Sequence, residues 1–238
     1  MLRKIKSKLR PLKRLYYIGN RRRCPLCKSG LREFHGFGII PRKDAKCPVC
    51  ETLERHRLFW LYIERLTDFH ANPPLKALHI VPETILEEKF RSLIGGGYYT
   101  ADLSMPDVDL KMDIMNIKLP DNSFNFIYCS HVLEHVSDDR KAMREFYRIL
   151  SVDGLAVLLV PITAESTFED PSIKDPQERL RIFGQADHVR RYGPDYLSRL
   201  EEAGFIVEKI DRRDFLTADE IEKMGITSAA GELYICRK

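Results

Sequence analysis

The sequence of 238 residues lacks any long apolar run. Apolar stretches such as Leu155–Pro161 are far shorter than the ~20 residues that cross a bilayer, and none follows the positively charged segment that begins a signal peptide. Internal repeats and low-complexity segments are also missing. These absences argue against membrane-spanning, fibrous and disordered proteins, and we expect a cytoplasmic protein. With 44% hydrophobic and 31% charged residues, the chain can form one α/β domain with a small appendage.

Acidic residues are missing from the first 32 positions, which contain twelve Lys or Arg. The formal net charge is +4, but residues 33–238 hold 27 Lys or Arg against 35 Asp or Glu, a net charge of −8. The basic character therefore belongs to the N-terminus, and we treat residues 1–23 as a basic N-terminal segment. Its apolar residues recur at helical steps that Pro11 interrupts: Leu2, Ile5, Leu9, Leu12 and Leu15. This stripe either makes peripheral contact with an anionic membrane, packs on the protein body, or is partly disordered.

Four of the six cysteines form two Cys-x2-Cys pairs that are separated by nineteen residues: Cys24, Cys27, Cys47 and Cys50. The spacing predicts a zinc-ribbon-like module over residues 24–50 that holds structural zinc. In a reducing cytoplasm, a tetrahedral metal satisfies four thiolates at two turns better than disulfides do. Four Cys ligands leave no open position for a catalytic water. A redox-active dithiol pair and an iron site remain alternatives, and Cys129 and Cys236 are expected to pack as small buried hydrophobes.

The rest of the chain divides into a connecting helix, residues 51–70, and a larger domain, residues 71–238. The helix is expected over Glu51–Phe69, before the Asn-Pro-Pro breaker at 72–74. From Leu75 onward strand-like and helix-like segments alternate, which is typical of a parallel sheet covered by helices on both faces. The expected strands are Ala77–Val81, Tyr98–Ala101, Phe126–Cys129, Leu155–Val160, Phe205–Ile210 and Glu232–Cys236. The expected helices are Thr84–Leu93, Arg140–Leu150 and Pro194–Ala203.

Polar residues follow several of these strands, where the ligands of an open parallel sheet bind. Asp102 follows the second strand, and a carboxylate there can accept hydrogen bonds from both hydroxyls of a ribose. Asp113 can accept a hydrogen bond from an adenine amino group, with Ile114 and Met115 offering an apolar face to the ring. The sequence therefore predicts a nucleoside-binding edge.

At this point the chain resembles the class I S-adenosylmethionine-dependent methyltransferases, in particular the group called type 11. The resemblance runs from about Lys76 to Cys236 and rests on YYTADLS, on MDI with LPDNSFNFIYCSHVLEHVSDD, on REFYRILSVDGLAVLLVPI and on HVRRYGPDYLSRLEEAGF. It implies an α/β fold, a Rossmann-like seven-stranded sheet with an antiparallel final strand. S-adenosylmethionine would lie over the first, second and fourth strand ends. A Cys-rich module before such a domain is similar to bacterial methyltransferases with an N-terminal zinc-binding module.

The first loop departs from this family. It normally carries an acidic residue followed by Gly-x-Gly-x-Gly, so that the backbone can approach the cofactor, whereas residues 79–84 read HIVPET. Either Glu83 holds the ammonium group of the cofactor instead, or Glu83 only begins a helix, where an early carboxylate favours the helix dipole. The family also places Ser130 and His131 in the cofactor pocket.

Two histidines are candidates for catalysis. Methyl transfer to a hydroxyl requires alignment of the acceptor and removal of its proton. His188 lies in a long connection after Val160, the usual place of a substrate lid, and is the first candidate base. His131 is the second, and it shares a helical face with His135 if the segment after Ser130 is helical. His135 itself is expected to be structural.

Three functions are consistent with these features. The first is S-adenosylmethionine-dependent O- or N-methylation of a polar small molecule or saccharide. The second is methylation of RNA, with residues 1–50 binding phosphates and Tyr16, Tyr17 and Phe34 stacking on bases. The third is a catalytically silent, zinc-dependent interaction protein. A nicotinamide enzyme is weaker, because its phosphate-binding turn would need the same missing glycines.

Overall fold

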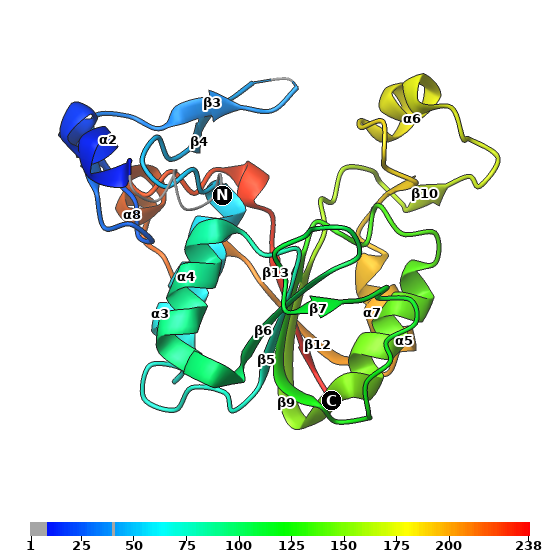
Figure 1. Cartoon of the computed structure of the whole chain (residues 1–238). Helices are drawn as coiled ribbons and strands as arrows, with labels where there is room; N and C mark the ends of the chain where they lie inside the picture. The colour runs from blue at the N-terminus through cyan, green and yellow to red at the C-terminus, as the bar shows by residue number, and fades with distance from the viewer. Residues whose placement is uncertain (1–8, 40) are drawn as a thin grey trace. The chain divides into compact units, whose positions relative to one another are not determined.

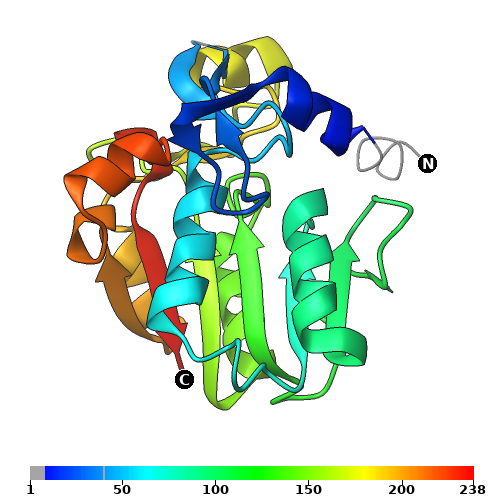
Figure 2. The same ribbon diagram turned by 90° about the vertical axis from the view of Figure 1, so that its left-hand side faces the viewer.

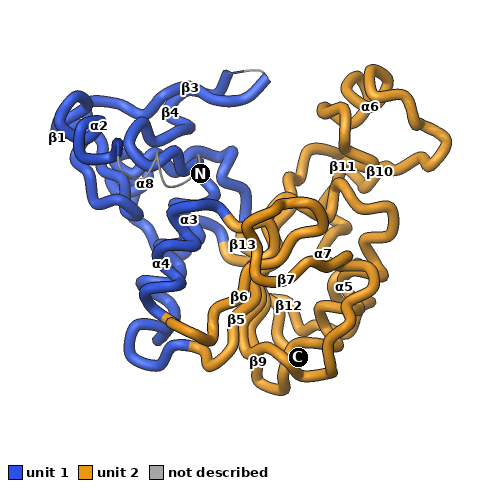
Figure 3. The backbone as a smooth tube through the Cα atoms, viewed as in Figure 1, with its two compact units in different colours: residues 1–73, 83–93, 211–232 blue, residues 74–82, 94–210, 233–238 orange. Residues whose placement is uncertain are grey.

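The computed structural model describes residues 9–39 and 41–238, which form two compact units (Figure 3). The first unit contains the described residues up to 73 together with residues 83–93 and 211–232. The second contains residues 74–82, 94–210 and 233–238. Both units are therefore assembled from separate stretches of the chain. The division of the chain into residues 1–23, 24–50, 51–70 and 71–238 stays a prediction.

The first unit begins with helix α2 (Arg10–Tyr16) and strand β1 (Ile18–Arg23). Pro11 stands in the first turn of α2, where its missing N–H has no helical partner to lose, so the described helix begins at the proline. The interruption of a longer stripe by Pro11 stays a prediction, because residues 1–8 lie outside the described part of the chain. Of the predicted stripe, Leu12 and Leu15 are exposed on α2, at 65% and 70%. Leu2 and Ile5 lie outside the described residues.

Two short hairpins carry the paired cysteines. Strand β1 pairs with β2 (Gly30–Leu31), and β3 (His35–Phe37) pairs with β4 (Arg42–Lys46), both antiparallel. Cys24 directly follows β1, and Cys47 directly follows β4. Each Cys-x2-Cys pair therefore sits in a turn at the end of a strand, as the ribbon prediction requires.

Helix α3 (Glu54–Leu66) is the central helix of the first unit, and it is shorter than predicted. It begins after Leu53, an extended residue whose N–H donates to His56 Nδ1 at 3.1 Å and so caps the helix. Phe90 of α4 (Thr84–Ile94) packs against the rings of Phe59 and Trp60, with ring centroids 6.0 and 5.9 Å apart. The residues from 211 to 232 add η2 (Arg212–Asp214), α8 (Ala218–Lys223) and η3 (Ser228–Ala230).

A buried arginine joins three stretches of the first unit. Arg57 of α3 has no exposed surface, and its guanidinium donates to the backbone carbonyls of Asp44, Ala45, Thr52, Met224 and Gly225 over 2.7–3.1 Å. The same group lies 4.1 Å from the ring centre of Phe34. Carbonyls that are far apart in the sequence therefore share one side chain as their donor.

The second unit is built on a seven-stranded sheet of order β12-β13-β9-β8-β5-β6-β7 (Figures 1 and 2). Its strands are β5 (Ala77–Ile80), β6 (Tyr98–Asp102), β7 (Leu110–Lys111), β8 (Phe124–Ser130), β9 (Leu150–Leu159), β12 (Ile206–Ile210) and β13 (Leu233–Arg237). The last strand, β13, runs antiparallel to both of its neighbours, whereas β5, β6, β7, β8 and β9 pair in parallel. The predicted seven-stranded sheet with an antiparallel final strand is confirmed.

Helices α5 (Asp139–Ile149) and α7 (Tyr196–Glu202) cover one face of this sheet (Figure 1). Met143 and Phe146 of α5 and Leu200 of α7 belong to the same buried cluster as the strand residues Ile127 and Leu158. Every residue of β5 is buried, as expected for a central parallel strand. Cys129 and Cys236 have no exposed surface, so the prediction that they pack as small hydrophobes is confirmed.

The long connection after Val160 has structure of its own. It contains a short hairpin of β10 (Phe168–Glu169) with β11 (Arg190–Arg191) and the helix α6 (Pro176–Phe183). Asp175 caps α6 by accepting from the N–H groups of Gln177 and Glu178, and Gly184 ends it at φ 88°. No helix of the described residues has both the length and the apolar character needed to traverse a bilayer.

Candidate functional site

The carboxyl ends of β5, β6 and β8 meet at one edge of the sheet in the second unit. Ile80 at the end of β5 pairs with Ala101 on one side and with Cys129 on the other. Each of these strands then continues into the candidate site, because Val81, Asp102 and Ser130 are the next residues along the chain. The register therefore gathers the predicted residues Asp102, Ser130 and His131 at one edge.

Two residues at this edge have unusual backbone conformations. Val81 has φ 52° and His131 has φ 57°, although neither is glycine. A β-branched residue in this region is an outlier, and such a conformation costs about 1–3 kcal/mol. Hydrogen bonds hold both: the Val81 N–H donates to Ala101 O, and the His131 N–H donates to Leu159 O, each at 2.8 Å. Strain of this kind is concentrated at functional sites, and here two such residues follow neighbouring strands.

Asp102 is held as a carboxylate. Its Oδ1 accepts from the N–H groups of Ser104 and Met105, at 2.6 and 2.5 Å, and from the Ser104 hydroxyl at 3.2 Å. Partial burial favours a higher pKa for Asp102, but these donors outweigh it and the pKa is lowered. All three hydrogen bonds from the described residues go to Oδ1, so Oδ2 is the oxygen available to a ligand.

Asp113 lies close to Asp102 along the adjoining loop. The N–H of Met112 donates to the carbonyl of Asp102 at 3.3 Å, and Asp113 Oδ1 accepts from the N–H of Met115 at 2.8 Å. Ile114 is buried next to it. The structure therefore brings the two predicted nucleoside-binding carboxylates into one loop region.

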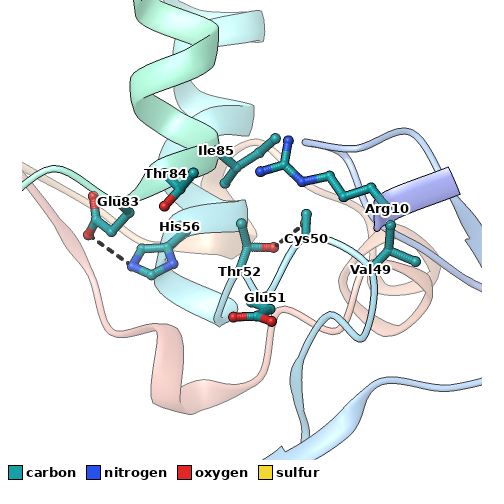
Figure 4. A pocket seen from close by; sticks show the side chains of 9 residues that line it. All are labelled: Arg10, Val49, Cys50, Glu51, Thr52, His56, Glu83, Thr84 and Ile85. Carbon is teal, nitrogen blue, oxygen red and sulfur yellow. Dashed lines mark hydrogen bonds and ion pairs between the residues drawn. The ribbon is translucent and has the colours of Figure 1, made fainter. Parts of the chain in front are cut away.

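Glu83 belongs to the first unit, where it pairs with a histidine that the sequence left without a role. Its Oε1 lies 3.0 Å from His56 Nε2, within a pocket that is also lined by Thr52 and Thr84 (Figure 4). Because His56 Nδ1 accepts from the Leu53 N–H, the proton of the neutral ring is on Nε2, the nitrogen that faces Glu83. Burial lowers the pKa of His56 although Glu83 acts in the opposite direction, so the imidazole is neutral near pH 7.

In the second unit His188 lies close to Glu134 and His135 of the HVLEHV motif. Residues 131–137 form turns, so the helical face that His131 and His135 would have shared does not exist. The rings of His135 and His188 meet edge to face at 4.7 Å, and His135 Nδ1 lies 3.2 Å from Asp187 Oδ2. Burial lowers the pKa of His188, and the neighbouring His135 adds to this effect. His188 is therefore neutral near pH 7. His131 is not among the grouped atoms, and its Nδ1 lies 3.3 Å from Ser130 Oγ.

Two buried arginines hold this part of the unit together. Arg190 donates to the carbonyls of Leu133, Val136 and Ser137 at 2.6–3.1 Å. It also pairs with Glu169 at 2.9 Å. Arg199 pairs with the same carboxylate at 2.9 Å and with the buried Asp139 at 2.9 Å. These side chains fix the turns that carry the histidines, and no local sequence pattern identifies such long-range partners.

The four predicted metal ligands lie together in the first unit. One pair of sulfur atoms, Cys24 and Cys50, is 3.6 Å apart, another, Cys27 and Cys47, is 3.8 Å apart, and all four lie within 4.8 Å of one another. Zinc–sulfur bonds of about 2.3 Å in a tetrahedron place the sulfurs roughly 3.8 Å apart, so the residues present fit a tetrahedral ion.

The two cysteine turns also share one backbone pattern. In each turn the N–H of the first cysteine donates to the carbonyl five residues on, Cys24 to Ser29 at 3.0 Å and Cys47 to Thr52 at 2.9 Å. In each turn the residue after the second cysteine, Lys28 or Glu51, has a positive φ, of 58° and 65°. Because the two turns share this backbone geometry, both cysteine pairs are suited to the same role, binding one metal ion.

Comparison with known proteins agrees with this geometry. Residues 99–158 match the family described as "Methyltransferase domain". A curated relative, the uncharacterized methyltransferase YcgJ of Bacillus subtilis (strain 168), is 39% identical over 75 residues, which cover 32% of this chain and 28% of that protein. The chain thus matches well under a third of the length of this relative.

Two solved structures share the fold. An S-adenosylmethionine-dependent methyltransferase from Mesorhizobium loti is 16% identical, with a TM-score of 0.50, and the match covers 76% of this chain and 98% of that one. The [4+2]-cyclase SpnF is 13% identical, with a TM-score of 0.51 and coverage of 99% and 94%. The fold is that of the class I methyltransferases. With the domain match, this confirms the resemblance to the S-adenosylmethionine-dependent methyltransferases, while the cyclase illustrates that one fold serves different reactions.

Proposed function

We propose that this protein is an S-adenosylmethionine-dependent methyltransferase that acts on an oxygen or nitrogen atom of a polar small molecule or saccharide. The observation that carries the proposal is the edge formed after β5, β6 and β8, with the ionised Asp102 and the strained Val81 and His131. Asp102 and His131 fall within residues 99–158, which match the methyltransferase domain. The acidic charge of residues 33–238 agrees with a small polar acceptor better than with a long nucleic acid.

The residues at this edge fit the parts of the cofactor. Asp102 Oδ2 would accept from the ribose hydroxyls, and Asp113 with Ile114 would hold the adenine. Ser130 and His131 would line the pocket. For the ammonium group, where the glycine-rich loop is missing, the sequence offers Glu83; because Glu83 belongs to the first unit, this role is proposed from the sequence alone. When bound, S-adenosylmethionine supplies an electrophilic methyl group on its sulfonium.

The proposed base is His188, with His131 as the second candidate. A general base must be unprotonated at the working pH, and burial keeps His188 in that state. Removal of the acceptor's proton as the new bond forms typically contributes a factor of about 10²–10⁴. Replacement of His188 by alanine would then lower turnover at saturating acceptor by roughly 10²-fold or more.

Cofactor binding is the first test. Calorimetric titration with S-adenosylmethionine and S-adenosylhomocysteine should show binding that Asp102→Asn weakens by about 10- to 100-fold, since a hydrogen bond to a charged group contributes about 1.5–3 kcal/mol. Asp107→Asn is the matched control, because Asp107 is an exposed carboxylate in the same loop. Absence of binding in the folded wild type would instead favour a catalytically silent interaction protein.

The cysteine cluster is proposed to hold structural zinc, on the basis of its four gathered sulfur atoms. A reducing cytoplasm is the location proposed with it, because thiolates there stay available to a metal. An RNA acceptor is the alternative to a small molecule. Salt-sensitive RNA binding that falls when the exposed Arg21 and Arg23 are replaced by alanine would favour RNA.

A further inference from the structure

The second unit contains a group of potential metal ligands that is separate from the four cysteines. Glu134, His135 and His188, called here the EHH cluster, each offer one ligand atom, and these atoms lie within 4.8 Å of one another. The geometry points to a binding site for one divalent transition-metal ion, with zinc the ion that it fits best.

The first argument is the state of His188. Its side chain is buried, and its Nε2 is enclosed without a hydrogen-bond partner among the described residues. A buried polar atom without a partner is costly and calls for an explanation. The ring also has a hydrogen bond to the backbone of Phe183. A ligating histidine usually bonds a backbone carbonyl or carboxylate through one nitrogen and the metal through the other, so a metal at Nε2 accounts for both observations.

In His135, too, one ring nitrogen has a partner and the other is available to a metal. Its Nδ1 lies 3.2 Å from Asp187 Oδ2, which leaves Nε2 for a metal. A carboxylate behind a ligating imidazole fixes the tautomer and raises the basicity of the ring. The two histidines thus each have an outer partner, one a backbone group and the other a carboxylate.

The third ligand and the rigidity of the cluster come from the turn that follows β8. The Glu134 side chain is buried, and its backbone carbonyl accepts from the Val189 N–H at 2.9 Å, which ties this turn to the segment carrying His188. Arg190 bonds the carbonyls on both sides of Glu134, those of Leu133 and Val136. Ligands on such a fixed frame lose little conformational freedom when they bind an ion.

The donor set indicates the kind of ion. Imidazole ligands suit zinc and other late transition metals, whereas magnesium and calcium prefer oxygen donors alone. Two histidines and one glutamate are a known ligand set of catalytic zinc, which keeps its fourth position open. Metal–ligand bonds of about 2.1 Å would draw the three atoms to roughly 3.4 Å from one another, whereas they now lie within 4.8 Å of one another.

The site has a consequence for the acceptor that rests on the proposed function. An acceptor oxygen at the open position would be oriented by the ion, and its pKa would be lowered. Nitrogen Nε2 of His188 cannot bind a metal and accept a proton at once, so with the ion bound the role of base passes from His188 to His131, the second candidate. Metal binding itself does not depend on methyl transfer, and the cofactor titration described above tests that function separately.

The experiment measures metal content in the full chain. Wild type and variants are equilibrated with two equivalents of zinc chloride, desalted and analysed by elemental mass spectrometry, with circular dichroism as the check on folding. His135→Ala and His188→Gln should each bind one ion less per chain than the wild type, and His70→Ala, an exposed histidine of the first unit, should bind the same number. The difference of one ion is the readout, whatever the cysteines hold.

A second variant tests the outer partner. Asp187 is 71% exposed on its side chain, so Asp187→Asn should fold normally. It should weaken zinc binding at the EHH cluster about 10- to 100-fold, as loss of a carboxylate behind a ligating histidine does. Cobalt(II) added to the wild type loaded with only one equivalent of zinc, which the four thiolates bind in preference, should give visible absorption without a thiolate charge-transfer band. Equal zinc content in the wild type and all folded variants would overturn the proposal.

Discussion

Replacement of Arg57 by methionine tests how far one side chain holds the first unit together. The variant keeps the length and apolar stem of the side chain but removes the donors to five backbone carbonyls. Each buried acceptor left without a partner costs about 1–3 kcal/mol, while removal of a buried charge recovers part of the sum. We therefore expect a loss of about 4 kcal/mol in the free energy of unfolding, in the range seen when a buried charge network is broken.

The chain supplies its own probe for this measurement. Trp60 is the single tryptophan, and it lies buried in α3, the helix that carries Arg57. Urea unfolding followed by its fluorescence reports on the first unit. With a denaturant slope of about 2 kcal/mol per molar urea, the midpoint should fall by about 2 M.

Arg65 provides a matched control on the same helix. It forms a two-pronged pair with Glu220 at 2.6 and 3.2 Å, but both side chains are about one-third exposed. Arg65→Met should therefore cost no more than about 1 kcal/mol. The reasoning is refuted if Arg57→Met changes the midpoint as little as Arg65→Met does.

Two further predictions concern the cysteine cluster and the buried ion pairs. Cys47→Ser should lower the zinc content by one ion per chain and reduce the melting temperature, because a structural metal contributes directly to folding; an unchanged zinc content would contradict the proposed site. Glu169 is the shared partner of Arg190 and Arg199, and although burial opposes them, these arginines lower its pKa. A carboxylate whose pKa is lowered in the folded state stabilises the protein at pH values above its unfolded-state pKa. This stabilisation is lost as the pH falls through the folded-state pKa. Glu169→Gln should therefore be less stable than the wild type at pH 7 by chemical denaturation, with the gap closing below about pH 4; a constant gap would be inconsistent with this assignment.

The sheet was predictable from the sequence because its strands are short, apolar and separated by turn residues. The predicted strand Ala77–Val81 differs from β5 by one residue, and the predicted helix Thr84–Leu93 differs from α4 by one. The strand ends also placed Asp102 and Ser130 correctly at the carboxyl edge. Parallel strands that are buried on both faces are continuous apolar runs, and such runs can be recognised from a few neighbouring residues.

Features that depend on distant partners were not predictable. The turns after Ser130 are held by Arg190, which lies more than fifty positions further along the chain. Residues 83–93 and 211–232 pack in the first unit although nothing local distinguishes them from the alternating elements around them. The pairing of Glu83 with His56 and the meeting of His135 with His188 are consequences of the same long-range packing.

The hydrogen bonds of Arg57 also set an order of events during synthesis. Two of its acceptors, Met224 and Gly225, are separated from it by 167 and 168 positions. At about 5–20 residues per second, the ribosome delivers them on the order of 10–30 s after Arg57 itself. The two cysteine turns are synthesised long before that, whereas Arg57 of α3 lacks its hydrogen bonds to Met224 and Gly225 until these residues are made. Arg57 and α3 are thus made well before the carbonyls that complete their hydrogen bonds, and nascent chains halted before residue 224 should expose α3 to proteases.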